Sequence, residues 1–229
     1  MSFDVSNYAV FNIFGLEVWL TETIVNTWIV MAALIILALI IRRKVGTYKE
    51  TPAGLQNVIE AIVEAFDRFV RNSAGEKLAF LGNWFFMVFI FILFSNLSGL
   101  LPGFRPPTAD WTVTFALALV TFALIQVMGA KYRGKAYFKS FLEPFFLFLP
   151  LNIIGEFARP ISLSFRLFGN ILAGMILMTI FYGLTPVFVQ IAIPAALHAY
   201  FDLIAALLQT YIFTVLSLSF IGAMAGTAE

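Results

Sequence analysis

The sequence lacks cysteine altogether and contains little charge and a single histidine. None of its 229 residues is cysteine, and 12% are charged. The missing cysteines exclude disulfides, thiolate metal sites and thiol catalysis, and one histidine, His198, cannot form a zinc site with other histidines. Soluble domains carry about a quarter charged residues and about half apolar ones, whereas 61% of this chain is hydrophobic. The composition predicts an integral membrane protein, and its scattered basic residues form no patch for nucleic acid.

Apolar runs divide the chain into segments of about 20 residues or more, the length that spans a bilayer. Within one membrane domain we expect five membrane helices, at 23–41, 83–101, 112–130, 145–182 and 186–225. The last two are too long to cross a membrane upright, so we expect them to be tilted, kinked or laid along it. The predicted fold class is therefore an all-α integral membrane protein.

Residues 51–72 show a different pattern, with apolar residues at three- and four-residue spacing and charged residues on the opposite face. This periodicity predicts an amphipathic helix, either lying at the cytoplasmic membrane interface or packed on a soluble partner. No Lys or Arg precedes Arg42. By the positive-inside rule, residues 1–22 lie outside and the basic loops 42–44 and 131–139 lie in the cytoplasm.

One segment has part of the spacing of a nucleotide-binding motif but lacks a residue that the motif needs. The segment GAKYRGKA at 129–136 has the glycine and lysine spacing of a phosphate-binding loop, but Ala136 stands where a magnesium-binding hydroxyl is needed. The segment also follows a predicted membrane helix instead of a strand. We therefore expect the chain to bind no nucleotide and no other cofactor.

Ionisable residues are rare in the last third of the chain. Between 144 and 228 the charged residues are Glu156, Arg159, Arg166 and Asp202. A charged residue inside a membrane segment costs about 2.5–3.5 kcal/mol on insertion scales, and therefore usually serves a function. Glu156 and Arg159, three residues apart, can pair on one helix face, and a structural ion pair is the simpler interpretation of them.

Polar residues form one stripe on each of the two long helices. At 3.6 residues per turn, the first stripe consists of Ser162, Arg166 and Asn170, and the second of His198, Asp202 and Gln209. Two such stripes indicate an intramembrane path for a small ion. A purely structural alternative, in which Asp202 neutralises Arg166 for packing, leaves Asn170, Gln209 and His198 unexplained.

The segments PISLSFRLFGN at 160–170 and LLQTYIFTVLSLSFIG at 207–222, with NLSGLLPG at 96–103, resemble the a subunit of F-type rotary ATP synthases. The resemblance covers nearly the whole chain. It implies a stator subunit whose last two helices form a tilted hairpin against a ring of c subunits. Two half-channels would then couple H+ or Na+ flow to ring rotation and ATP synthesis. The implied partners are the c-ring, the peripheral-stalk b subunits, the rest of the ATP synthase and the lipids of a bacterial plasma membrane.

The resemblance also assigns roles to residues. Arg166 matches the essential arginine that faces the ring carboxylates, Asn170 the asparagine one turn later, and Gln209 the glutamine opposite. Many members have Glu or His where this chain has Met175. The titratable side chains that pass ions along the half-channel open to the outside form what we call the outer relay, which would here depend on Asp202. The remaining candidate ion-pathway residues are His198, Ser162 and Glu156.

The coupling ion stays open between H+ and Na+, with H+ favoured because most members of the family use it. The alternative function is an ion-coupled secondary transporter or channel. Such transporters often contain internal repeats around a midplane site, and the sequence has no matching halves. The candidate residues therefore favour the stator subunit.

Overall fold

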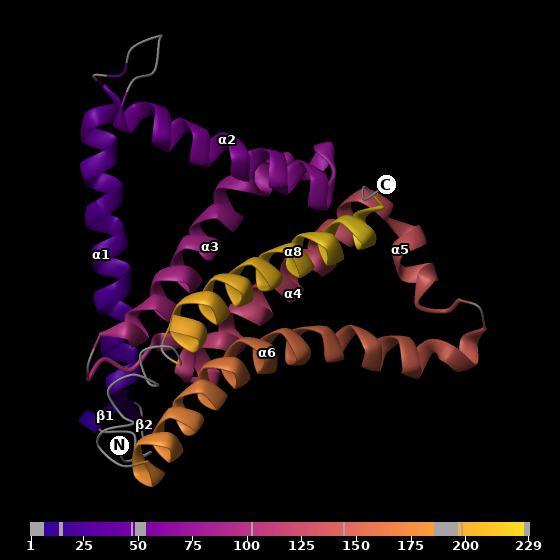
Figure 1. Cartoon of the computed structure of the whole chain (residues 1–229). Coiled ribbons are helices and arrows are strands. Elements are labelled where there is room, and N and C mark those ends of the chain that lie inside the picture. The colour runs from indigo at the N-terminus through magenta and orange to yellow at the C-terminus, as the bar shows by residue number, and fades with distance from the viewer. Residues whose placement is uncertain are drawn as a thin grey trace.

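The computed structural model describes residues 7–13, 16–46, 48, 54–101, 103–143, 145–185, 197 and 199–226, most of them in helices (Figure 1). The two strands are β1 (Asn7–Ile13) and β2 (Leu16–Thr21). The α-helices are α1 (Glu22–Val45), α2 (Leu55–Ala74), α3 (Gly82–Leu97), α4 (Trp111–Arg133), α5 (Lys135–Ser140), α6 (Leu149–Leu184) and α8 (Ala205–Ala225). Short 3-10 turns are η1 (Glu76–Leu81), η2 (Ser98–Leu100), η3 (Pro107–Ala109) and η4 (Phe146–Phe148), and η5 (Ala199–Ile204) is a π-helical turn.

Five helical segments among the described residues are long and apolar enough to cross a membrane. They cover Glu22–Val45, Glu76–Leu100, Trp111–Arg133, Phe146–Leu184 and Ala205–Ala225. The prediction of an all-α membrane protein with about five membrane helices is confirmed. The structure adds one feature that the sequence pattern did not indicate, an antiparallel hairpin of β1 and β2 before the first helix.

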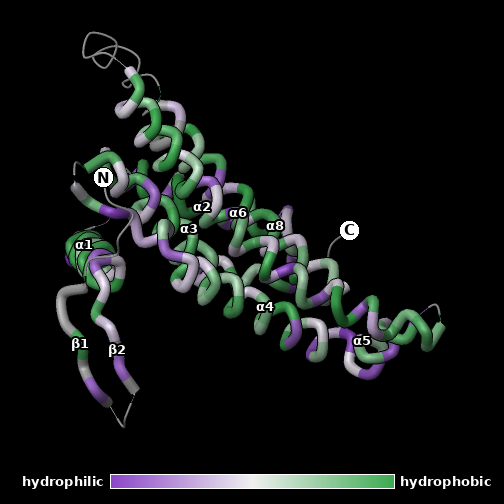
Figure 2. Tube along the Cα trace, turned by 90° about the horizontal axis from the view of Figure 1, so that it is seen from below, coloured by the Kyte–Doolittle hydropathy of each residue, from purple (hydrophilic) through white to green (hydrophobic). Residues whose placement is uncertain are grey.

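Helix α1 is apolar along most of its length, and the hairpin lies beside it (Figure 2). Its N-terminal part contacts α3 and η3, where Asn26 Nδ2 donates to the Arg105 carbonyl at 2.9 Å. Its side chains are largely exposed in the isolated chain, as expected for a helix that faces lipid or partner subunits. Glu22 lies in the first turn, and Arg42, Arg43 and Lys44 lie in the last. These charges complement the helix dipole and end the apolar span.

Helix α2 is strongly amphipathic and lies across the ends of α1 and α3 (Figure 1). It begins at Leu55, after Gly54, and its buried side is formed by Phe66, Val70 and Ala74. These residues pack in a core cluster with Phe85 of α3 and Leu218 of α8. The C-terminal half of α2 is therefore anchored on the membrane helices, whereas Leu55, Val58 and Ile62 in its N-terminal half remain exposed.

Helix α4 packs against both α6 and α8 and so holds the last two membrane helices together. Of the helix expected at 186–225, residues 186–196 and 198 lie outside the described part of the chain. Asp110 caps it by accepting a hydrogen bond from the Thr112 backbone nitrogen at 2.8 Å, and Gly134, with a φ of 54°, ends it. With 36 residues, α6 is about 54 Å long at 1.5 Å per residue. That length exceeds the roughly 30 Å of a hydrocarbon core, and α6 bends along its course (Figure 1).

A second core cluster determines which face of α6 points outward. Leu163 and Leu167 are buried against Ile92 of α3, Ala118 of α4 and Phe213 of α8. Side chains four residues apart share a face of a helix. The burial of the leucine face therefore leaves the stripe that contains Arg166 on the open side of α6.

Candidate functional site

Three of the predicted site residues lie along the open side of α6. Ser162, Arg166 and Asn170 are all exposed in the isolated chain. Arg166 makes no hydrogen bond or ion pair with any part of the chain that the structure describes. A guanidinium keeps its charge at any physiological pH. The structure thus presents a permanent positive charge on the outer surface of a membrane helix.

One hydrogen bond joins the stripe of α6 to α8. Asn170 Nδ2 donates to Gln209 Oε1 at 2.6 Å, one helical turn beyond Arg166. Gln209 is 1% exposed, and its Nε2 is buried without a hydrogen-bond partner among the described residues. Buried polar groups are usually paired. The two N–H donors of Gln209 Nε2 therefore have no partner among the described residues, next to an asparagine one turn from Arg166.

A pocket of about 220 Å³ extends from Arg166 along α6. Ser162 and Arg159 line it on α6, and Phe220 lines it on α8. The Arg159 guanidinium carbon lies 5.2 Å from the centre of the Phe220 ring, within the range of a cation–π contact. This contact holds Arg159 between the two helices.

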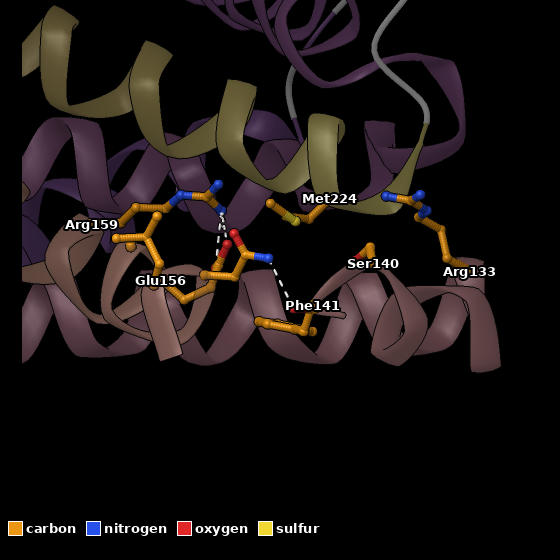
Figure 3. A pocket seen from close by; sticks show the side chains of 9 residues that line it. Arg133, Ser140, Phe141, Glu156, Arg159 and Met224 are labelled. Atoms are coloured by element: carbon orange, nitrogen blue, oxygen red, sulfur yellow. Dashed lines mark hydrogen bonds and ion pairs between the residues drawn. The ribbon is translucent and has the colours of Figure 1, made fainter. Parts of the chain in front are cut away.

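A second pocket, of about 340 Å³, continues toward the end of α4 (Figure 3). It shares Gly155 and Arg159 with the first, so the two pockets meet at Arg159. Figure 3 shows Glu156 and Arg159 together at one end of it and Arg133 at the other. The two pockets lie one after the other along α6, from the basic end of α4 to Arg166. Their lining is largely apolar but includes the charged side chains of Arg133, Glu156, Arg159 and Arg166, and we call this row of pockets the polar route after those side chains.

The expected pair between Glu156 and Arg159 is confirmed. Arg159 Nη1 lies 2.8 Å from Glu156 Oε1 and 3.0 Å from Oε2. The carboxyl side chain is 9% exposed and the guanidinium side chain 26%. Pro160 follows directly and has no N–H for the Glu156 carbonyl four residues earlier. The Glu156 carbonyl therefore lacks its helical N–H donor in the same turn as the ion pair.

Two residues outside the predicted set support this carboxylate. Gln126 Nε2 on α4 donates to Glu156 Oε2 at 3.3 Å, and the Tyr137 hydroxyl on α5 donates to Gln126 Oε1. Tyr137 is 1% exposed. Burial, and next the negative charge of Glu156, raise the pKa of Tyr137 above its ordinary value. No local sequence pattern signals these contacts, because the partners lie 11 and 30 residues apart in the chain.

A third polar group joins three elements beside Gln209. Thr108 Oγ1 of η3 donates to Asn96 Oδ1 of α3 at 2.6 Å, and Asn96 Nδ2 lies 3.5 Å from Thr210 Oγ1 of α8. All three side chains are at most 2% exposed. Asn96 belongs to the quoted NLSGLLPG segment, and Thr210 belongs to the quoted LLQTYIFTVLSLSFIG segment. This polar group connects the loop between α3 and α4 with the helix that bears Gln209.

Two candidate residues cannot be compared with this geometry. His198 lies outside the described residues, and Asp202 lies in η5 with a side chain that the structure does not describe. Met175 is helical, and its carbonyl accepts a bond from Thr179 Oγ1 at 2.8 Å. The outer relay through Asp202 and His198 therefore stays a prediction. Within the described part of the chain, no group of three or more His, Cys, Asp or Glu residues could hold a metal ion.

Comparisons with known proteins agree with the quoted motifs. The family model for the ATP synthase A chain matches residues 24–222. ATP synthase subunit a 1 of Syntrophotalea carbinolica is 37% identical over 86% of this chain and 83% of its own length. ATP synthase subunit a 2 of a Bradyrhizobium species is also 37% identical, over 91% of this chain and 90% of its own length.

A third relative matches a similar share of the chain. ATP synthase subunit a 2 of a Picosynechococcus species is 35% identical over 92% of this chain and 88% of its own length. The residues that the family model matches include the stripe of α6 and Gln209. This multi-pass membrane chain belongs to the ATP synthase A chain family, as a subunit a of the membrane-embedded stator of an ATP synthase.

Proposed function

We propose that this subunit couples proton flow to rotation of the c-ring through two half-channels separated by Arg166. The observation that carries the proposal is the position of Arg166. It lies exposed on α6, unpaired with the described residues, at the end of the polar route. A charge on a lipid-facing surface costs about 2.5–3.5 kcal/mol on insertion scales. A partner surface with carboxylates, as on a c-ring, removes that cost and supplies the opposite charge.

Arg166 acts on each ring carboxylate electrostatically. Two opposite unit charges about 4 Å apart attract by about 4 kcal/mol at an effective dielectric constant of about 20. This attraction favours the ionised carboxylate and so releases its ion. It is also weak enough for rotation to separate the charges. Because a guanidinium carries a positive charge, Arg166 blocks direct passage of cations between the two half-channels.

The inner half-channel follows the two pockets that meet at Arg159. Glu156 lines the wider pocket and Ser162 the narrower one. The basic residues at the end of α4 assign this end to the cytoplasm by the positive-inside rule. Protons released at Arg166 leave past Ser162 and Glu156.

The outer half-channel approaches from the opposite side of the membrane, past Gln209 and Asn170. The polar group of Asn96, Thr108 and Thr210 connects this region with the loop between α3 and α4. Asp202 and His198 are the titratable residues proposed for this path. The N-terminus then lies outside, and the complex, with its c-ring and peripheral-stalk b subunits, lies in a bacterial plasma membrane.

The test uses the whole ATP synthase in sealed vesicles, wild type beside Arg166→Ala. An imposed gradient, of protons in one series and sodium in another, drives ATP synthesis while passive leak is recorded. We expect Arg166→Ala to lower synthesis by about 100-fold or more, as loss of a preorganised charge does elsewhere, and to alter the leak. If only the proton gradient drives synthesis, the coupling ion is H+. If only the sodium gradient drives it, the coupling ion is Na+.

Arg43→Ala serves as the matched control. Arg43 is an exposed arginine in the last turn of α1, far from the polar route, and its loss should leave synthesis near the wild-type rate. Wild-type synthesis in Arg166→Ala would contradict the proposal and make Arg166 a structural residue.

A further inference from the structure

The inner pocket contains a feature that an ion path alone does not require. A polar chain runs from Tyr137 on α5 through Gln126 on α4 to Glu156 on α6. Its first member is fully buried, and its last member faces the pocket of about 340 Å³. Three elements thus contribute to the surroundings of one carboxylate.

The chemistry of the chain fixes the orientation of the Gln126 amide. An ionised carboxylate only accepts hydrogen bonds, so the amide must turn its nitrogen toward Glu156. Its oxygen then faces Tyr137, whose hydroxyl can donate to it. In this orientation both the nitrogen and the oxygen of the Gln126 amide have a hydrogen-bond partner. The flipped orientation would place the amide oxygen against a carboxylate oxygen of Glu156.

The backbone is adapted to hold the tyrosine in this position. A Cβ atom on Gly129 would lie 2.5 Å from Tyr137 Cε2, closer than atoms can approach. The ring also packs edge-on against Phe141 with centroids 5.2 Å apart. Gly129 and Phe141 therefore hold the phenol ring against α4, and its hydroxyl reaches Gln126.

We propose that Tyr137 and Gln126 are positioning residues that keep the Glu156 carboxylate ionised and facing the inner ion path. This inference rests on the proposed function, in which protons leave past Glu156. The groups that face the carboxylate are Gln126 on α4, Arg159 on α6 and, across the pocket, Arg133, while Met224 of α8 carries no charge. Burial of Glu156, which is 7% exposed, opposes its ionisation, whereas these hydrogen bonds and positive charges favour the ionised form. Loss of the oriented amide donor should let Glu156 take up a proton at higher pH.

The test measures ATP synthesis in inside-out vesicles, in which the medium sets the pH on the cytoplasmic side. The rate of synthesis should fall when the medium is acidified, because protonated Glu156 can no longer accept the protons released at Arg166. Tyr137→Phe keeps the ring and removes only the hydroxyl, and Gln126→Leu removes the amide. We expect both variants to move the acidic limb of the rate profile upward by about one pH unit, the equivalent of one hydrogen bond to a charged group.

Three further variants make the result specific. In a Glu156→Gln background, neither Tyr137→Phe nor Gln126→Leu should shift the profile further. Tyr132→Phe removes an exposed hydroxyl that donates to the Lys77 carbonyl at 3.2 Å, and should keep the wild-type profile. Rates are taken per assembled complex, so that a loss of assembly does not count as a shift.

The inference would be overturned if Tyr137→Phe and Gln126→Leu left the acidic limb at its wild-type pH, whether or not the maximal rate of synthesis fell. A shift that persists without the Glu156 carboxylate would do so as well. Arg166→Ala, measured in the same series, separates the two hypotheses. If Arg166→Ala is inactive and the Tyr137→Phe profile is unshifted, only the positioning role of Tyr137 is rejected. If Arg166→Ala synthesises ATP at the wild-type rate, the proposed function itself is rejected.

Discussion

Asn170 Nδ2 lies 2.6 Å from Gln209 Oε1, and this bond ties α6 to α8 one turn from Arg166. The glutamine is buried and the asparagine is exposed on the open side of α6. Removal of one partner of such a bond leaves a buried polar group unsatisfied, at a cost of about 1–3 kcal/mol. We expect Asn170→Ala to lower the stability of the complex by that amount and to slow ATP synthesis.

A double-mutant cycle checks this prediction. Asn170→Ala, Gln209→Leu and the double variant are compared by thermal unfolding of the purified complex. The double variant should be destabilised by less than the sum of the two single variants, because the two side chains share one interaction. Strict additivity would show that the bond between the helices contributes nothing.

The ion pair of Glu156 and Arg159 provides a second prediction. Its side chains are 9% and 26% exposed, whereas those of the pair Arg68–Glu64 on α2 are 65% and 68% exposed. Removal of one partner from a largely buried pair costs about 3 kcal/mol, and from a surface pair about 0.5 kcal/mol. We expect Arg159→Ala to destabilise the complex far more than Arg68→Ala. Equal changes in the unfolding temperature of the two variants would contradict this ranking.

Gly129 gives a prediction about close packing. A Cβ atom there would overlap the Tyr137 ring at 2.5 Å, whereas a Cβ on Gly183 would meet no atom within 4 Å. Gly129 lies in α4, and Gly183 lies in the last turn of α6. Gly129→Ala should destabilise the protein by about 1–3 kcal/mol through overpacking. Gly183→Ala should stabilise it by about 0.5–1 kcal/mol, since alanine is the better helix former. Chemical denaturation of the detergent-solubilised protein compares them, and a stable Gly129→Ala variant would contradict the packing described.

The raised pKa of Tyr137 predicts a pH dependence of stability. Burial and the nearby Glu156 charge make the folded protein hold the phenol proton more tightly than the unfolded chain does. The corresponding stability is complete below a pH of about 10, the ordinary value for tyrosine. It is lost as pH rises from there through the higher folded pKa. We expect the unfolding temperature to fall over this range, and to fall less in Tyr137→Phe. The same decline in both proteins would assign the effect to other groups.

Much of this architecture could be predicted from local patterns. Apolar length identified the five spans, and four-residue spacing placed Ser162, Arg166 and Asn170 on one face of α6. The pair of Glu156 and Arg159 was predictable because both residues lie on adjacent turns of one helix. These features depend on the periodicity of a helix and on the energetic cost of charge in an apolar segment.

The supporting contacts were not predictable in the same way. Gln126 lies 30 residues from Glu156, and Thr108 reaches Asn96 from a different element. Such contacts depend on how the helices pack, which no spacing rule specifies. The hairpin of β1 and β2 was missed because the expectation for residues 1–22 considered charge alone, and both strands are short.

The central claim is that Arg166 faces the carboxylates of the ring, and cysteine cross-linking tests it most directly. This chain contains no cysteine, so each introduced thiol is unique within it. Single cysteines replace Ser162, Arg166 or Asn170 on the open stripe, or Ser164, which is fully buried beside Thr114. In each complex, a second cysteine replaces the ring carboxylate. A disulfide requires Cα atoms about 4.4–6.8 Å apart. Our account predicts a cross-link from Arg166→Cys, weaker ones from its stripe neighbours and none from Ser164→Cys. No cross-link from any position on the stripe would contradict it.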